Sequence, residues 1–217
     1  MESPLARFDR LLRDEGFALL AGLDEAGRGC LAGPVVAAAV ILRAGTNLPD
    51  VDDSKQLTPR DRAAQAVLVR ERAFAIGVGF VGPRTIDSIN IRQASLLAMR
   101  RALRRARVRV ASDPSHNALG LLALVDGNDL PGGAGCPERA VIGGDAKSQA
   151  IAAASIIAKT VRDGFMVRLG AEFPDYGFES HKGYGTPEHL AALERHGACR
   201  WHRFSYAPVA QLSLFPA

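Results

Sequence analysis

The stretch FALLAGLDEAGRGCLAGP, residues 17–34, decides how this chain is organised. Residues 17–23 form an apolar run of strand length that ends on two adjacent carboxylates, Asp24 and Glu25, and Arg28 follows between two glycines. Carboxylates at a strand end can hold a divalent cation because hard cations prefer oxygen ligands. Glycine lets a backbone approach a ligand closely because no Cβ intervenes. A metal site beside a backbone cradle and a fixed positive charge suits a phosphodiester substrate, whereas an ordinary surface turn leaves most of the string unexplained.

The composition is that of a globular protein with one domain. The chain has 217 residues, of which 47% are hydrophobic and 23% charged, which is enough for a full core. The net charge of +4 is compatible with a polyanionic partner. No apolar run is long enough to cross a bilayer, and the N-terminus lacks a secretory pattern. The three cysteines form no C-x-x-C pair, so we expect a cytoplasmic protein without a disulfide framework or zinc site.

Lysine is rare in this chain. Only four of the 27 basic residues are lysine, at positions 55, 147, 159 and 182, and the others are arginine. A lysine kept in such a chain indicates a position that needs a compact ammonium group, which a planar guanidinium does not replace. Lys55, Lys147 and Lys182 are therefore candidate functional residues, while for Lys159 an ordinary surface position explains the residue equally well.

The pattern of apolar residues predicts an α/β domain. Strands are expected at 17–24, 35–42, 73–81, 121–125 and 141–142, and helices at 5–15, 59–72, 86–105 and 148–169 and from 187 onward, with an irregular tail from 208. Thr58 and Pro59 have the form of a helix cap followed by a first-turn proline. This order favours a mixed central sheet flanked by helices, with a C-terminal helical part. We divide the chain into a catalytic domain, residues 1–210, and a short tail, residues 211–217.

Two more acids lie at the ends of apolar elements. Asp126 follows the run 121–125, and Asp145 precedes the alanine-rich helix. Taken singly, Asp126 is typical of a turn, and Asp145 is typical of a helix N-terminus, where it complements the helix dipole. If both converge with Asp24 and Glu25, their mutual repulsion demands cations. Two divalent ions would then support in-line displacement at a phosphodiester.

Several long motifs together resemble one family. The string 24–35 is similar to the signature of the type 2 ribonucleases H, ribonuclease HII, and so are DSKQL at 53–57, IDSINI at 86–91, VDGN at 125–128, GDAKS at 144–148 with the helix after it, and KGYGT at 182–186. The resemblance covers about residues 17–208, in the family's order. It implies an RNase H-like fold, cleavage of RNA in RNA–DNA hybrids, and incision 5′ of single ribonucleotides embedded in duplex DNA, leaving a 3′-hydroxyl and a 5′-phosphate.

The resemblance also implies roles for particular residues. The family's four metal-binding acids fall on Asp24, Glu25, Asp126 and Asp145, which would hold two Mg²⁺ or Mn²⁺ ions. The loop that senses the ribose 2′-hydroxyl falls on Gly27, Arg28 and Gly29, and the tyrosine that packs on the neighbouring deoxyribose falls on Tyr184. Only the 2′-hydroxyl separates RNA from DNA at a given site, so a close backbone approach there is physically sensible. Phosphate contacts are expected from Lys55, Lys147 and Lys182, with a hydrogen bond from Ser54.

The chain departs from the family pattern at two places. Cys30 stands where family members often have proline, which should leave the loop less stiff. Tyr206 stands in place of phenylalanine in the string HRFSY at 202–206, which leaves the C-terminal packing in question. Only 23 residues precede Asp24, which favours the type 2 enzyme over the related type 3 enzyme with its additional N-terminal domain.

The last residues have a motif of their own. QLSLF at 211–215 resembles the peptide by which bacterial replication and repair proteins bind the sliding clamp. Leu212, Leu214 and Phe215 would enter apolar pockets, and Gln211 would make polar contacts, as in other peptide-in-groove complexes. The alternative is that this tail folds back on its own helices.

Two other functions remain open from the sequence. A nucleic-acid-binding or clamp-binding protein without catalysis is one, although all four acids are present. A DNA-cutting nuclease of the RNase H-like fold, such as a resolvase or integrase, is the other, although the Gly-Arg-Gly string argues against it. We expect a monomer.

Overall fold

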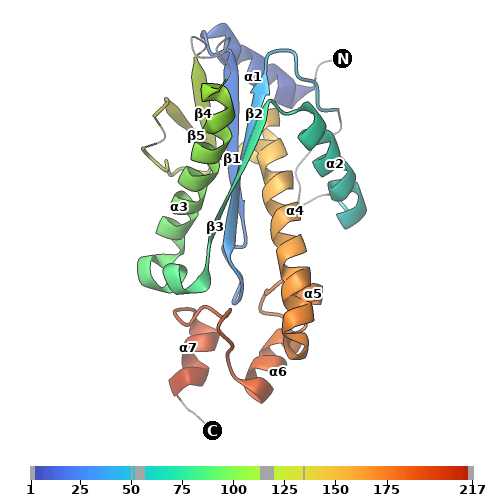
Figure 1. Cartoon of the computed structure of the whole chain (residues 1–217), viewed down its shortest axis with the longest axis vertical. Helices are drawn as coiled ribbons and strands as arrows, with labels where there is room; N and C mark the ends of the chain where they lie inside the picture. Colours follow the sequence, from blue (N-terminus) through green and yellow to red (C-terminus); the bar gives the residue numbers. More distant parts are fainter. Residues whose placement is uncertain (1–2, 50, 52–56, 113–119, 134, 215–217) are drawn as a thin grey trace.

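The computed structural model describes residues 3–49, 51, 57–112, 120–133 and 135–214, with side chains up to residue 211. A mixed five-stranded sheet runs through its middle in the order β3-β2-β1-β4-β5 (Figure 1). The strands are β1 Leu19–Ala26, β2 Val35–Arg43, β3 Ala75–Val81, β4 Leu121–Asp126 and β5 Glu138–Val141. β2 pairs antiparallel with β1 and β3, whereas β4 is parallel to both β1 and β5. The mixed central sheet expected from the sequence is confirmed.

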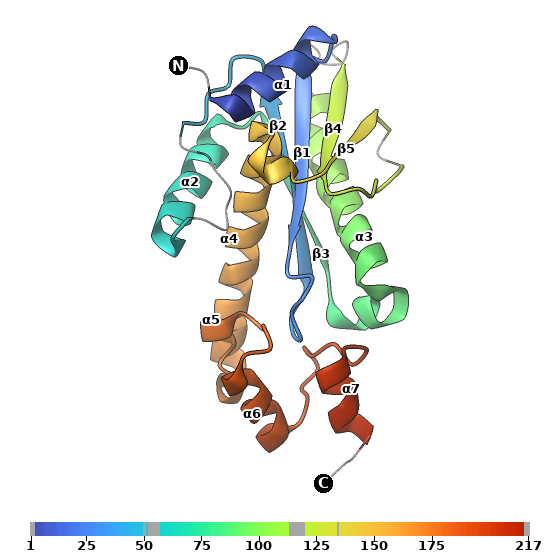
Figure 2. The ribbon, with the colours of Figure 1, turned by 180° about the vertical axis from the view of Figure 1, so that it is seen from behind.

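Helices cover both faces of the sheet. The α-helices are α1 Pro4–Asp14, α2 Pro59–Arg72, α3 Pro83–Ala111, α4 Gln149–Glu172, α5 Phe178–His181, α6 Pro187–His196 and α7 Ala207–Leu214. Figures 1 and 2 show α3 and α4 on opposite sides of the strands, with α5, α6 and α7 gathered below the end of β1 and α1 at the other end. Thr58, Ser148 and Thr186 each cap a helix by accepting a hydrogen bond from an amide three residues on.

The sheet separates two apolar cores. Side chains of β1 alternate, so that Leu20 packs in the core under α4 and Leu19 and Leu23 pack in the core under α3. Helix α4 approaches β1 so closely that a Cβ on Gly22 would lie 2.0 Å from the carbonyl carbon of Ala150. The strand that carries the first two acids is therefore buried on both faces and packs at close backbone distance against α4.

Several predicted elements need correction. Helix α3 is longer than expected and is interrupted at Asn90, where φ is 64° and the side chain caps the next turn by accepting from the amide of Gln93. The last strand covers Glu138–Val141 rather than 141–142. The expectation of an irregular tail from residue 208 is wrong, since Ala207–Leu214 is helical. No helix in the described parts of the chain is long and apolar enough to cross a membrane.

Candidate active site

A cleft of about 310 Å³ opens at the ends of β1 and β4, next to the side of α4. It is lined by Asp24, Glu25, the loop 26–29, Asp126, Ser155, Lys159 and Tyr184. Three of the four predicted acids, the Gly-Arg-Gly loop and the predicted tyrosine therefore meet in one cavity, although they come from segments far apart in the sequence.

Strand register brings Asp24 and Asp126 together. Leu23 pairs with Val125 across the parallel strands, so the next residue of each strand, Asp24 or Asp126, projects on the α4 side. Asp24 is 6% exposed. Burial, and then the negative charges of Glu25 and Asp126, raise the pKa of Asp24 well above its ordinary value, against a hydrogen bond from Ser155.

Glu25 sits one residue further on β1 and keeps a counter-ion. Arg28 donates from Nη1 to Glu25 Oε1 at 2.9 Å. Burial still raises the pKa of Glu25, since the guanidinium offsets only part of the desolvation and Asp126 adds repulsion. The protein thus holds carboxylates close together without supplying enough positive charge to neutralise them.

The fourth acid, Asp145, lies beside the cleft rather than among the residues that line it. It occupies the short 3₁₀ turn before α4, is 6% exposed, and accepts from the amide of Ala146 at 3.1 Å. Its neighbour Gly144 donates its amide to Asp126 Oδ1 at 2.7 Å. Asp145 is therefore linked to the other acids through one backbone hydrogen bond.

The donor set fits a hard divalent cation. Carboxylate oxygens are the ligands such ions prefer, and Asp24 lies buried near two further acids, Glu25 and Asp126, which line the same cleft. In the described part of the chain, no three His, Cys, Asp or Glu side chains are already arranged around a point that would hold one ion.

The Gly-Arg-Gly loop is constrained from one side and open on the other. Gly27 has φ of 95°, and a Cβ there would lie 1.9 Å from Nε of Arg162, so glycine is required by the protein itself. A Cβ on Gly29 would meet no atom within 4 Å, and its φ lies outside the left-handed region. Nothing in the fold demands glycine at 29, so its missing side chain leaves room for a ligand.

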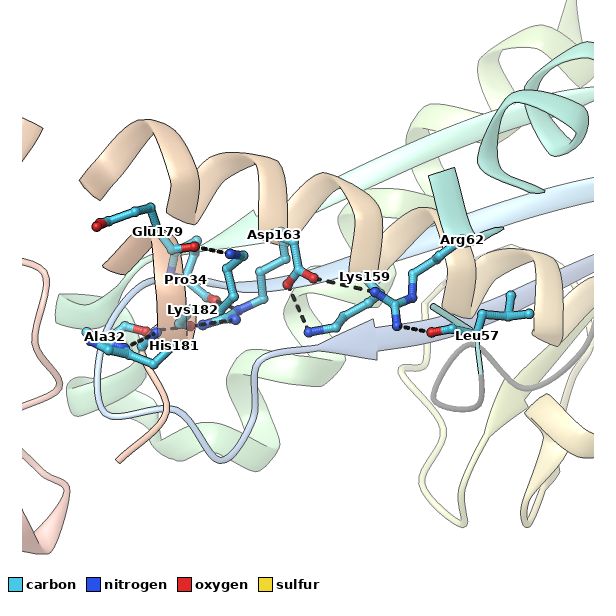
Figure 3. Close-up of polar contacts among 11 residues, drawn as sticks. Ala32, Pro34, Leu57, Arg62, Lys159, Asp163, Glu179, His181 and Lys182 are labelled. Atoms are coloured by element: carbon cyan, nitrogen blue, oxygen red, sulfur yellow. Dashed lines mark hydrogen bonds and ion pairs between the residues drawn. The ribbon is translucent and has the colours of Figure 1, made fainter. Parts of the chain in front are cut away.

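Tyr184 and Lys159 form another wall of the cleft. Tyr184 is 43% exposed, and Lys159 Nζ lies 5.7 Å from the centre of its ring. Asp163 accepts from Lys159 at 2.9 Å and lies 3.7 Å from Arg62, whose guanidinium also donates to the carbonyl of Leu57 (Figure 3). Sequence reasoning did not select Ser155 or Lys159. Their spacing of four residues puts both on one face of the helix predicted at 148–169, a signal that was available.

The predicted phosphate-binding lysines are placed as follows. Lys147 donates from Nζ to the carbonyl of Ile142 at 2.7 Å, and Lys182 donates to the carbonyl of Glu179 (Figure 3). An ammonium group has three donors, so each lysine keeps donors for another acceptor. Ser54 and Lys55 lie outside the described residues.

The C-terminal segment holds the loop from behind, which the sequence did not predict. Arg203 is fully buried and donates to the carbonyls of Gly27, Arg28 and Gly33. Tyr206, the departure from the family string, donates its hydroxyl to the carbonyl of Arg28 at 2.6 Å. The other departure, Cys30, is fully buried.

The C-terminal motif is described only in part. The Gln211 side chain is exposed on α7. Leu212 and Leu214 belong to that helix, with their side chains outside the described set, and Phe215 lies outside the described residues.

Comparison with known proteins identifies the family. The family model for ribonuclease HII matches residues 21–209. The chain belongs to the ribonuclease HII family. Ribonuclease HII of Maricaulis maris is 52% identical over 88% of this chain and 82% of its own, and that of Geobacillus thermodenitrificans is 49% identical over 95% and 75%. The family comprises metal-dependent endonucleases, the type 2 ribonucleases H, which cleave RNA in RNA–DNA hybrids.

Solved structures agree with the fold. Ribonuclease H2 of Pyrococcus horikoshii superposes with a TM-score of 0.70 at 24% identity, covering 90% of this chain and 97% of its own. The ribonuclease HII in the PCNA complex from Archaeoglobus fulgidus gives a TM-score of 0.68 at 26% identity, over 87% and 95% of the two chains. A ribonuclease HIII bound to Mn²⁺ gives 0.71 at 17% identity, over 98% and 73%. The first and the last of these likenesses, both below 25% identity, concern the fold alone.

Proposed function

We propose that this protein incises duplex DNA on the 5′ side of an embedded ribonucleotide, in addition to cleaving longer RNA–DNA hybrids. The observation that carries the proposal is the meeting of Asp24, Asp126 and the loop 27–29 in one cleft. The acids serve the chemistry at a phosphodiester, and the loop next to them presents backbone groups to the sugar of the same nucleotide.

Asp24, Glu25 and Asp126, with Asp145 beside them, are the residues that would hold two Mg²⁺ or Mn²⁺ ions. When bound, such ions would supply activation of a water molecule and charge stabilisation for the leaving oxygen of an in-line displacement. The carboxylates of Asp24, Glu25 and Asp126 bring hard oxygen donors to the ends of β1 and β4, and Asp24 is buried there. The Mn²⁺ bound by the ribonuclease HIII of the same fold is consistent with this assignment.

Substrate contacts follow from the walls of the cleft. Gly29 leaves space for the ribose, and the exposed ring of Tyr184 offers an apolar surface for the neighbouring sugar. Lys159 adds a positive charge near that ring. Lys147 and Lys182 remain proposed phosphate contacts, as do Ser54 and Lys55.

A pair of duplexes tests the proposal. One duplex carries a single ribonucleotide and the other is all DNA, and both are incubated with the protein and Mg²⁺, then with Mn²⁺. We expect one cut 5′ of the ribonucleotide and an intact control. Cleavage of both duplexes would favour a general DNA nuclease, and cleavage of neither would favour a binding protein. Asp126→Asn should abolish cleavage while leaving duplex binding.

Gly29→Ala tests the role of the loop separately. The new methyl group fits the free protein, since no atom lies within 4 Å, so stability should be unchanged. Cleavage at the single ribonucleotide should fall at least about tenfold because the methyl group occupies the space for the ligand. Gly164→Ala on α4, where only the Arg168 side chain comes within 4 Å at 3.9 Å, is the matched control and should keep full activity.

The sliding clamp is a proposed partner. Residues 211–214 of the motif belong to the end of α7, with the Gln211 side chain exposed. The PCNA complex of the archaeal relative shows that a ribonuclease HII of this fold binds a clamp. We propose that this chain binds the bacterial clamp through Gln211, Leu212, Leu214 and Phe215, and acts as a monomer on its duplex.

A further inference from the structure

Arg203 makes an unusual set of contacts for a buried arginine. Its side chain is fully buried, and its guanidinium donates to backbone carbonyls of the loop that follows β1 and to one tyrosine hydroxyl. Nη2 donates to Gly27 at 2.6 Å, Nη1 donates to Arg28 at 2.7 Å, and Nε donates to Gly33 at 3.1 Å. One side chain thus binds both ends of the loop.

Tyr206 completes this arrangement. Its hydroxyl accepts from Arg203 Nη1 at 3.0 Å and donates to the carbonyl of Arg28 at 2.6 Å. Its ring lies 5.1 Å from the guanidinium carbon of Arg203. The carbonyl of Arg28 therefore receives two donors, one from each side chain.

The segment that carries the two residues is itself anchored. Asp87, in the first turns of α3, accepts from the amides of Phe204 and Ser205 at 3.0 and 2.9 Å and from the Ser205 hydroxyl at 2.6 Å. These hydrogen bonds hold the segment that carries Arg203 and Tyr206 against α3. A displacement of the loop 27–29 away from this segment would break several hydrogen bonds at once.

Fixing a carbonyl also fixes the amide of the same peptide group. In a trans peptide the C=O and N–H bonds point in opposite directions. With the carbonyls of Gly27 and Arg28 held toward Arg203, the amides of Arg28 and Gly29 point away from that buried side chain, toward the side on which these residues line the cleft.

We propose that Arg203 and Tyr206 are positioning residues for recognition of the ribose 2′-hydroxyl, and that the Tyr206 hydroxyl strengthens this recognition in this chain. Neither residue touches the substrate. They act by setting the direction of the peptide groups of the loop 27–29. The inference rests on the proposed function of that loop.

Tyr206→Phe tests the proposal because it removes one hydroxyl and keeps the ring. The measurements are kcat/KM for the duplex with one ribonucleotide and the inhibition constant of the all-DNA duplex as a competitor. We expect kcat/KM to fall about three- to tenfold, the effect of losing one hydrogen bond to a carbonyl. The inhibition constant should change less than about twofold, since the competitor has no 2′-hydroxyl to be read.

Tyr176→Phe is the matched control. Tyr176 also donates its hydroxyl to a backbone carbonyl, that of Gly197 at 2.9 Å, in the same C-terminal part. The Tyr176→Phe variant should lose about as much thermal stability as Tyr206→Phe, while its kcat/KM and the inhibition constant of the all-DNA duplex stay unchanged. An equal change in kcat/KM and in the inhibition constant, or an unchanged kcat/KM in Tyr206→Phe, would overturn the proposal. Failure of the unmodified protein to cut the ribonucleotide duplex would instead overturn the proposed function.

Discussion

Mild acid should destabilise this protein through two buried histidines behind Tyr184. His189 and His202 are fully buried, and their Nε2 atoms are 3.0 Å apart. His189 Nδ1 lies 2.8 Å from the carbonyl of Tyr184, which can only accept, so Nδ1 carries the hydrogen. His189 Nε2 must then accept from His202, whose Nδ1 accepts from the amide of Cys199 at 3.0 Å. The chain of hydrogen bonds requires both rings to be neutral.

The magnitude follows from the pKa values. Burial is the main reason why the pKa of each ring is lowered from 6.5 to about 4. Below pH 6.5 the unfolded chain therefore binds protons on these rings that the folded chain does not bind. The contribution of the two neutral rings to the free energy of unfolding is present above pH 6.5 and is lost as the pH falls toward 4. Between pH 7.5 and 5, one ring gives a loss of about 2 kcal/mol. The second ring adds a loss in the same direction, because a charge on one ring further disfavours a charge on the other in the folded state. We take about 1 kcal/mol as the lower limit for the pair.

Other groups titrate in the same range, so the assay must isolate these two rings. His181 stacks on His189 with ring centres 4.3 Å apart, and Tyr176 and Cys199 contact His202. Asp9 acts in the opposite sense, since burial raises its pKa to about 6 and the folded state gains protons there. Comparison of the unmodified protein with a variant cancels these contributions.

The comparison uses the double variant His189→Asn, His202→Asn. Urea unfolding at pH 7.5 and pH 5, at constant ionic strength, gives the free energy of unfolding of each protein. The unmodified protein should lose at least about 1 kcal/mol more than the double variant over this interval. His196→Asn, a change at an exposed histidine, should behave like the unmodified protein. Equal losses in the unmodified protein and the double variant would refute the reasoning.

Two further outcomes are expected. Gly22→Ala should lower the free energy of unfolding by about 1–3 kcal/mol in urea titrations, because its methyl group would lie 2.0 Å from the backbone of Ala150; an unchanged value would show that α4 can move away from β1. Deletion of residues 211–217 should leave hybrid cleavage intact and abolish binding to an immobilised bacterial clamp; a loss of thermal stability or activity would favour a tail that packs on its own helices.

Local patterns predicted most of the strands well, because a strand depends on neighbours in the sequence. The run that ends at Asp24 is a strand, and its even residues face one core, as a period of two requires. The boundaries of α3 and the break at Asn90 were missed, since the apolar spacing of 86–105 continues on both sides of that residue. Helix α7 was missed, although Pro208 stands in its first turn, where proline is compatible with a helix.

Long-range contacts could not be predicted from the sequence alone. Arg203 is 175 residues from Arg28, whose carbonyl it holds. No local pattern distinguishes it from the other arginines of an arginine-rich chain. The departure at Tyr206 was noticed as a question of packing, but its hydrogen bond to Arg28 depends on the path of the whole C-terminal segment. The sequence therefore predicted several of the residues that line the cleft, but not the residues that hold them in place.

The buried arginines of this protein have hydrogen-bond partners within the fold, whereas the buried acid Asp24 lies near other acids. This difference supports the proposed chemistry. Arg162 and Arg203 are fully buried, yet each donates to at least three backbone carbonyls, so the fold itself satisfies these cations. Asp24 is buried near Glu25 and Asp126 and is repelled by both. Isolated buried charge opposes folding unless it is compensated. The chain thus compensates its buried arginines, whereas Asp24 lies among acids that repel it, which supports the proposed binding of an external cation there.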